Sequence, residues 1–217
     1  KCRKRITEYF AALPRPHTVA IETVGFYRWL WELLEPIVEK LVLADATQAR
    51  ALAGRRLKTD REDALNIAEL LAADRLPTSY APPIEVQLLR DLTRHRNGFS
   101  RQHARVLCRV KSIMNANNRP GPARLHSDGL IRYVKAQGPK LPPRHVEMLW
   151  NCVDQLALTE RQMQEAERTI GEVVQRENFA SAYAILVSFP GVATVTAATV
   201  IAEVGDFKRF KAAKSIG

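Results

Sequence analysis

Two long stretches of helical apolar spacing constrain what this chain can form. The first runs from Ile84 to about Asn117, and the second from about Pro143 to Asn178. Between them NNRPGP cannot continue a helix, because proline lacks the backbone donor and clashes with the preceding turn. Two amphipathic helices joined by a broken connection predict a helical hairpin.

The second stretch has coiled-coil-like spacing. Its apolar residues alternate at three and four positions, with interruptions at Glu160 and Glu167. They are Val146, Leu149, Val153, Leu156, Met163, Ile170 and Val174. Such a hairpin packs on itself or on a second subunit, and the sequence leaves both arrangements open. A homo-oligomer formed through the coiled coil is the expected assembly.

The N-terminal part has a different pattern. HTVAIET (17–23) has the β-branched core of a buried strand and delivers Glu22 to its end, a helix follows over 26–36, and LVLAD (41–45) predicts a second strand. Strand, helix and strand at this distance predict a parallel βαβ unit. LPTSYAPP (76–83), with three prolines, marks a domain boundary. The expected fold class is therefore α/β plus α.

Positive charge is concentrated in one segment. The whole chain has a net charge of +10, and residues 84–135 hold 11 Lys/Arg against 3 Asp/Glu, a balance of +8. Arginines clustered on a helix suit a polyanionic partner, because neutralised phosphates release counterions. The alternative is a solvated basic surface. The candidate nucleic-acid contacts here are Arg90, Arg94, Arg101, Arg105, Arg109 and Lys111. His95, His103 and His126 lie in the same basic region; they are interpreted as solvated side chains, with a phosphate contact as the alternative.

The stretch LKTDREDALNIAELL (57–71) carries two aspartates, Asp60 and Asp63, at the start of a predicted helix. Thr59 and Glu62 form a capping box, so negative charge here is explained by the helix start alone. Residues at i and i+3 also share a helix face. If Glu22 reaches that face, three carboxylates meet and suit Mg²⁺ or Mn²⁺, which can assist phosphodiester cleavage.

The last segment places Pro190 and Gly191 between two apolar helical stretches, FASAYAILVSF and VATVTAATVIAEV. Helix, Pro-Gly turn and helix are similar to a helix-hairpin-helix, whose amides can hold a phosphate. A plain helical turn is the alternative. There is no run of about 18 uncharged apolar residues and no apolar signal-peptide core, so we expect no membrane partner and a cytoplasmic location.

The array IETVGFYRWLWELLEP, LVLADATQARALAGRRLKTDREDALNIAELL and FPGVATVTAATVIAEVGDFKRF resembles the DEDD-type transposases of insertion sequence family 110, relatives of the Piv-type invertases. The resemblance implies a partial RuvC-like catalytic domain (1–78), an Arg-rich helical or coiled-coil region (79–180) and the start of a transposase domain (181–217). It assigns Glu22, Asp60 and Asp63 as Mg²⁺-binding catalytic residues. Lys58 and Arg61, which flank Asp60, are expected to contact nucleic acid.

The resemblance also implies a bacterial, nucleoid-associated DNA recombinase with a covalent serine intermediate, guided in some members by an element-encoded RNA. We expect the family's first aspartate and its serine to lie outside these 217 residues, and the chain alone to be inactive in cleavage. Two other interpretations stay open: a catalytically incomplete remnant that still binds nucleic acid, and a structural coiled-coil protein.

Overall fold

The computed structural model describes residues 3–23, 25, 27–53, 59–121, 126–210 and 212. The chain divides into two compact units, Lys1–Ala81 and Pro82–Gly217. The first is a small α/β unit and the second is helical, which confirms the α/β plus α fold class. In the described part of the chain no helix combines the length and the apolar character needed to cross a membrane.

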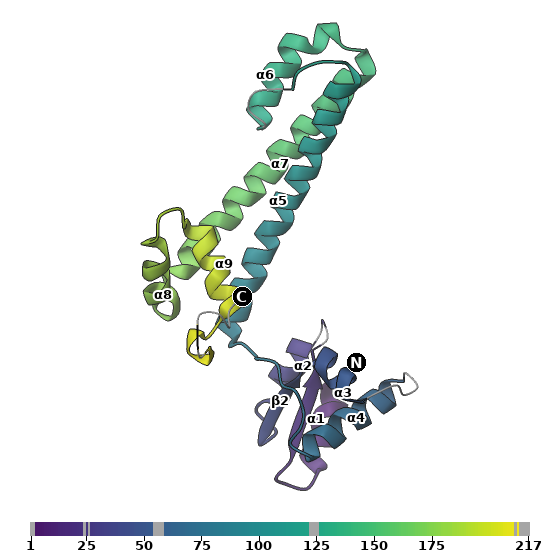
Figure 1. The fold of residues 1–217 in the computed structure, drawn as a ribbon, viewed down its shortest axis with the longest axis vertical. Helices are drawn as coiled ribbons and strands as arrows, with labels where there is room; N and C mark the ends of the chain where they lie inside the picture. Colours follow the sequence, from purple (N-terminus) through teal and green to yellow (C-terminus); the bar gives the residue numbers. More distant parts are fainter. Residues whose placement is uncertain are drawn as a thin grey trace. The chain divides into compact units, whose positions relative to one another are not determined.

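The N-terminal unit is built around a parallel pair of strands (Figure 1). Its elements are α1 (Arg3–Ala12), β1 (Thr18–Glu22), α2 (Tyr27–Leu34), β2 (Lys40–Ala44), α3 (Ala46–Ala53) and α4 (Asp60–Ala72). β1 and β2 pair from Thr18 opposite Lys40 to Glu22 opposite Ala44. The predicted βαβ unit is therefore present, with each strand ending slightly earlier than its sequence pattern suggested.

A small apolar core holds this unit together. Ile21 of β1, Leu34 of α2 and Leu43 of β2 are buried against each other, and Ile6 and Phe10 of α1 pack on them. The parallel register brings the carboxyl ends of both strands to one edge, so Glu22 and Asp45, which follows β2, belong to the same edge.

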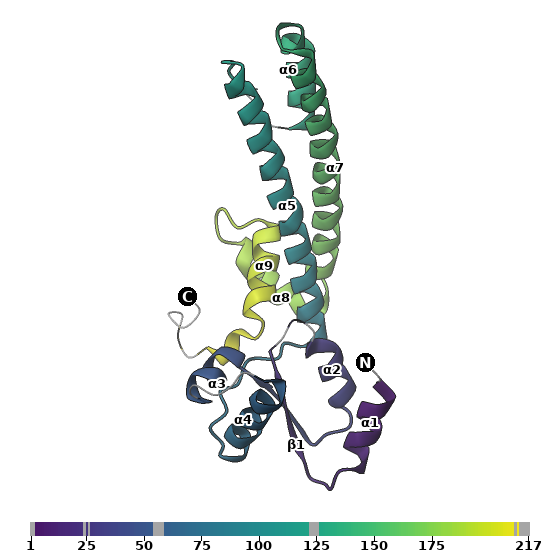
Figure 2. The same ribbon diagram turned by 90° about the vertical axis from the view of Figure 1, so that its right-hand side faces the viewer.

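The C-terminal unit is dominated by α5 (Ile84–Ala116) and α7 (Pro143–Val174), which lie side by side along most of their length (Figures 1 and 2). Arg96 bonds to Glu167, and His103 bonds to Glu160, so residue numbers rise on one helix as they fall on the other. The predicted hairpin thus packs on itself in an antiparallel arrangement.

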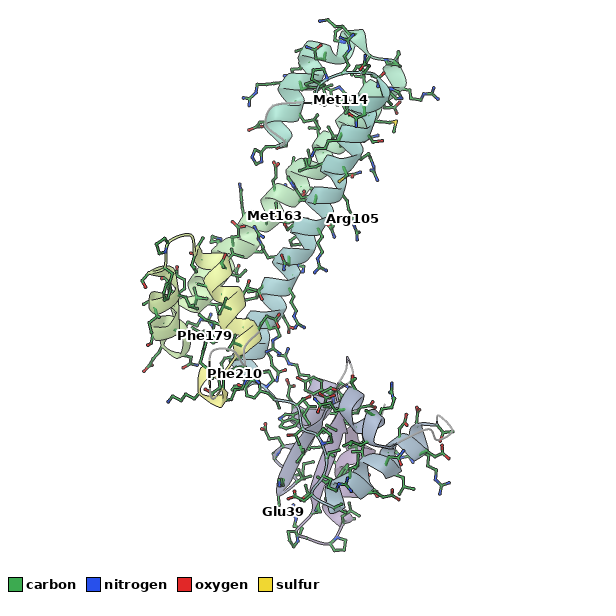
Figure 3. All side chains as sticks on the ribbon, in the orientation of Figure 1. Glu39, Arg105, Met114, Met163, Phe179 and Phe210 are labelled. Atoms are coloured by element: carbon green, nitrogen blue, oxygen red, sulfur yellow. The ribbon has the colours of Figure 1, made fainter. Side chains whose placement is uncertain are left out.

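The end of the hairpin holds α6 (Ser127–Gln137) and a short 3₁₀ turn (Gly138–Lys140), neither of which the sequence analysis predicted. Leu130 and Val134 of α6 are buried in one core cluster with residues of α5 and α7. Met114, labelled in Figure 3 near this end of α5, is 1% exposed. The helix forms because its apolar face reaches this cluster, with Leu130 and Val134 buried and Ile131 and Tyr133 packed against it.

The other end of the hairpin packs on α8 (Glu177–Val187) and α9 (Thr194–Val204), and a 3₁₀ turn (Phe207–Arg209) follows. The predicted helix to Asn178 instead ends at Val174, because Arg176 adopts an extended backbone that starts α8. This break turns Phe179, labelled in Figure 3, onto Leu89 and Ile170, where it is 5% exposed.

Candidate nucleic-acid interface and carboxylate site

Five arginines form a single stripe along α5. The positions are Arg90, Arg94, Arg101, Arg105 and Arg109, at intervals of four, seven, four and four residues. At 100° per residue these positions fall within an arc of about 100°, and they extend over about 28 Å of helix. We call them the arginine stripe. The buried residues of α5 occupy the opposite face.

The first two members of the arginine stripe bind α9. Arg90 Nε donates to the carbonyl of Ala202 at 2.9 Å, and a second Arg90 nitrogen donates to the carbonyl of Glu203 at 3.3 Å. Arg94 makes two 2.8 Å bonds to the Glu203 carboxylate. The hydrogen bond from Arg94 is the main reason why the pKa of Glu203 is lowered, and burial opposes it. These two arginines hold the C-terminal end of α9 to α5.

The other three members have their charge facing solvent. Arg101, Arg105 and Arg109 are exposed, and among the described residues the one hydrogen bond found for them joins Arg109 to Gln155 at 3.5 Å. Arg105 lies midway along the hairpin (Figure 3). Lys111 is exposed but lies outside the arc. This half of the arginine stripe can therefore accept an anionic ligand without losing an internal ion pair.

The start of α4 shows the Thr59 half of the predicted capping box. Thr59 has an extended backbone, and its Oγ1 accepts a hydrogen bond from the Glu62 amide at 3.2 Å. Glu62 Oε2 is buried and has no hydrogen-bond partner within the described ranges. Asp60 is exposed at the first helical position, and Asp63 is half-buried three residues later in the same first turn. Arg61 is exposed, and Lys58 lies outside the described residues.

Glu22 and Asp63 line the same small cavity of about 20 Å³, together with residues of α3. Arg50 of α3 approaches Glu22 to 3.8 Å between charged atoms. Asp60 does not line this cavity. Among the described residues, the group of His, Cys, Asp or Glu side chains whose ligand atoms all lie within 4.8 Å of one another does not include Glu22, Asp60 or Asp63. The structure thus unites two of the three predicted carboxylates.

Asp45 is a further carboxylate at this sheet edge that the sequence analysis did not consider. Its Oδ1 accepts hydrogen bonds from the amides of Thr47 and Gln48 at 3.0 and 2.9 Å, and its Oδ2 accepts one from the Gln48 side chain at 3.2 Å. Asp45 therefore caps α3. The signal was visible, since an aspartate at the end of an apolar strand and before a helical pattern is a typical N-cap.

The turn between α8 and α9 contains Gly191, whose φ of +85° suits glycine. The Val192 amide donates to the Phe189 carbonyl at 3.1 Å, and α9 then begins after Ala193, which has no side-chain cap. A side chain on Gly191 would meet open space. The first amides of α9 therefore have no side-chain acceptor at the Ala193 cap position.

Three residues that the sequence analysis took as solvated or ordinary meet on the hairpin. His103 of α5, His126 before α6 and Glu160 of α7 place one ligand atom each within 4.8 Å of the others. Burial opposes the ionisation of Glu160, but hydrogen bonds from Ser127 and His103 outweigh it, so its pKa is lowered. No local signal reveals this group, since its members come from three segments joined only by the fold.

A small parallel α/β unit with acidic residues at its sheet edge, followed by a helical unit with an arginine stripe, suits a protein that works on nucleic acid. Comparison with known proteins agrees. The family model of DEDD-type IS110 transposases, described as "Transposase", matches residues 2–117, and that of the "Transposase IS116/IS110/IS902 family" matches residues 183–217. The chain belongs to the IS110 family of transposases.

A curated relative supports this assignment. The "Putative transposase y4qE" of Sinorhizobium fredii (strain NBRC 101917 / NGR234) is 26% identical over 187 residues. The alignment covers 86% of this chain and 45% of the relative, so the chain spans less than half the length of that protein.

Proposed function

We propose that this chain binds DNA for an insertion-sequence transposase, and that the exposed half of the arginine stripe makes the contact. The observation that carries the proposal is the exposure of Arg101, Arg105 and Arg109 on one face, where no acidic partner neutralises them within the described part of the chain. Membership of a transposase family supports DNA as the polyanion.

The contact is expected to go to phosphates and not to base edges. Neighbouring members of the exposed half are four residues apart, about 6 Å along the helix axis. Each strand of duplex DNA carries a phosphate about every 3.4 Å along the helix axis, so arginines at this spacing can each reach a backbone phosphate. Such contacts position the duplex without reading its sequence. Gly191 and the first amides of α9 offer a second phosphate contact of the helix-hairpin-helix kind.

The test measures the affinity of the 217-residue chain for duplex DNA at salt concentrations from about 50 to about 200 mM. The variant replaces Arg101, Arg105 and Arg109 with alanine. We expect affinity near 0.1 M salt to fall roughly several-hundredfold and the log–log salt slope to lose about 2.7, since each phosphate contact contributes about 0.9. These losses are upper values, because partial contacts release fewer counterions.

The matched control replaces Lys135, Arg144 and Arg161 with alanine. These residues are exposed on α6 and α7, and their replacement removes the same number of positive charges. If overall charge were responsible, both triple variants would lose affinity equally. Equal losses, or no dependence on salt in the parent chain, would contradict the proposal. The same titration with a structured RNA compares the two polyanions, because a guide RNA is a further expected partner of the family.

We further propose that the N-terminal unit is the RuvC-like part of a metal-dependent recombinase. Its carboxylates have the donor chemistry that Mg²⁺ or Mn²⁺ prefers. Their arrangement fits in part, since Glu22 and Asp63 share one cavity while Asp60, three residues earlier in the first turn of α4, does not line it. A bound divalent ion would supply a polarised water or stabilise a leaving oxygen in phosphodiester cleavage. Glu22 and Asp63 would hold the ion, with Asp60 as a third donor.

Ion binding at this cavity is testable without cleavage. In a Mn²⁺ titration followed by electron paramagnetic resonance, we expect Asp63→Asn to weaken Mn²⁺ binding about tenfold or more, within the range of a lost ligand contact. Asp74→Asn is the control, because Asp74 is exposed at the other end of α4. Equal binding by both variants would remove Asp63 from the proposed ligand set. We propose separately that the antiparallel pair of α5 and α7 is the family's coiled-coil region.

A further inference from the structure

We propose that His103, His126 and Glu160 bind a divalent transition-metal ion. Their nitrogen and oxygen donors favour zinc, and the bound ion would join α5, α6 and α7. His103 Nε2 lies 3.2 Å from Glu160 Oε1, and His126 Nδ1 lies 3.5 Å from the same oxygen. Tetrahedral zinc with bonds of about 2.0–2.1 Å holds its ligands about 3.3 Å apart. The distance from each histidine nitrogen to Glu160 Oε1 therefore suits two ligands of one ion, and the two nitrogens lie within 4.8 Å of each other.

The carboxylate is oriented by a second set of contacts. The Ser127 amide donates to Glu160 Oε1 at 3.0 Å, and the Ser127 hydroxyl donates to Glu160 Oε2. These bonds fix the plane of the carboxylate while Oε1 still faces both imidazoles. Outer contacts of this kind are typical of metal-ligating carboxylates, because they set the direction of the ligand lone pair.

The site is accessible to an ion and offers a further coordination position. The side chains of His103 and Glu160 are 13% and 19% exposed, whereas that of His126 is 72% exposed. All three line a cleft of about 440 Å³ that Met163, labelled in Figure 3, also lines. Water in this cleft can complete the coordination. The site lies on the side of α5 that faces α7, away from the arginine stripe.

The donor set distinguishes this ion from magnesium. Two imidazole nitrogens and one carboxylate oxygen suit zinc, or ferrous iron in a two-histidine, one-carboxylate arrangement, whereas magnesium prefers oxygen ligands. Along the chain, His103 lies 57 residues before Glu160, and His126 lies 34 residues before it. A metal at this point would tie α6 to both long helices.

The experiment uses the untagged 217-residue chain after removal of metals with a chelator. We expect it to take up one Zn²⁺ per chain in competition with a chromophoric chelator, and to show Co²⁺ absorption bands typical of a nitrogen and oxygen site. Mg²⁺ in large excess should not displace either ion. Zn²⁺ should also raise the melting temperature, because it binds the folded chain.

His126→Ala and Glu160→Gln should each abolish Zn²⁺ uptake, and Ser127→Ala should weaken it 10- to 100-fold. His95→Ala is the matched control, since His95 is exposed on the same helix as His103 and lies outside the cluster. Circular dichroism checks that each variant folds, and the exposure of His126 makes its variant the least disruptive. Uptake retained in His126→Ala, lost equally in His95→Ala, or absent from the parent chain would overturn the proposal.

Discussion

The two halves of the arginine stripe have the same residue type on the same helix face but different surroundings. Arg90 and Arg94 reach the end of α9 and bond to its carbonyls and to Glu203. Arg101 and Arg105 are exposed, and within the described ranges no hydrogen bond or ion pair joins them to α9. A basic stripe therefore does not have one role along its length. Where an acidic helix end is in reach, arginine stabilises the fold, and elsewhere its charge is available to a ligand.

The largest effect on stability is expected from Arg90→Ala. The guanidinium is 19% exposed and donates to two carbonyls at the end of α9, so its removal leaves part-buried acceptors without their charged donor. The free energy of unfolding of the helical unit should fall by about 2 kcal/mol. Urea unfolding followed by circular dichroism measures this change. Arg101→Ala is the control and should cost less than about 0.5 kcal/mol. Equal losses would erase the difference between the two halves.

The converse expectation applies to Arg105→Ala. This arginine is exposed and has no hydrogen bond within the described ranges, so the free energy of unfolding should change by less than about 0.5 kcal/mol. Affinity for duplex DNA near 0.1 M salt should fall about eightfold, or about 1.2 kcal/mol, for one lost phosphate contact. Fluorescence anisotropy with labelled DNA measures it. A larger loss of affinity in Arg94→Ala than in Arg105→Ala would reverse the proposed assignment.

Local patterns in the sequence were enough for the long elements. Apolar periodicity gave α5 and α7 to within a few residues, and alternating strand and helix signals gave the βαβ unit. Helix α6 could not be predicted because its apolar residues form one short run, from Leu130 to Val134, that shows no clear period between the glycines and prolines around it. The three helical turns of α6 become stable only through burial against α5 and α7.

The partners of charged residues could not be predicted, because they are set by the fold and not by spacing. Arg94 and Glu203 are 109 residues apart, and no local rule links them. The same limit applies to the carboxylates. Spacing on α4 correctly placed Asp60 and Asp63 in its first turns, but only the packing of α4 near β1 decides that Asp63 shares a cavity with Glu22.

Thr59→Ala tests, in the N-terminal unit, whether the aspartates of α4 are needed to start the helix or are free to bind a ligand. If the Thr59 hydroxyl starts α4, its loss should lower the free energy of unfolding of this unit by about 1 kcal/mol, because the Glu62 amide loses its acceptor. Thr7→Ala is the control, since Thr7 lies within α1 and bonds only to a carbonyl of its own helix. Chemical unfolding followed by tryptophan fluorescence reports on this unit through Trp29 and Trp31, and on α7 through Trp150. No loss in Thr59→Ala would mean that the aspartates start the helix themselves.

The smallest expected effect is a pH dependence at Glu203. Its pKa is lowered in the folded chain, chiefly by the hydrogen bond from Arg94. A carboxyl with a lowered folded pKa stabilises the fold above its unfolded pKa of about 4.3, and this contribution is lost as the pH falls through the folded pKa. Because the side chain is 41% exposed and solvent screens the pair, the contribution should stay below about 1 kcal/mol.

Melting temperatures of the parent chain and of Glu203→Gln, measured from pH 7 down to pH 3, separate this contribution from the other acidic groups. The parent should be the more stable of the two near neutral pH, and the difference should shrink toward zero as Glu203 takes up its proton. Glu160, whose pKa is also lowered, titrates in both proteins and so cancels in the comparison. A difference that stays constant across this range would show that Glu203 holds α9 through its shape and backbone and not through its charge. The two halves of the arginine stripe would then differ in packing alone.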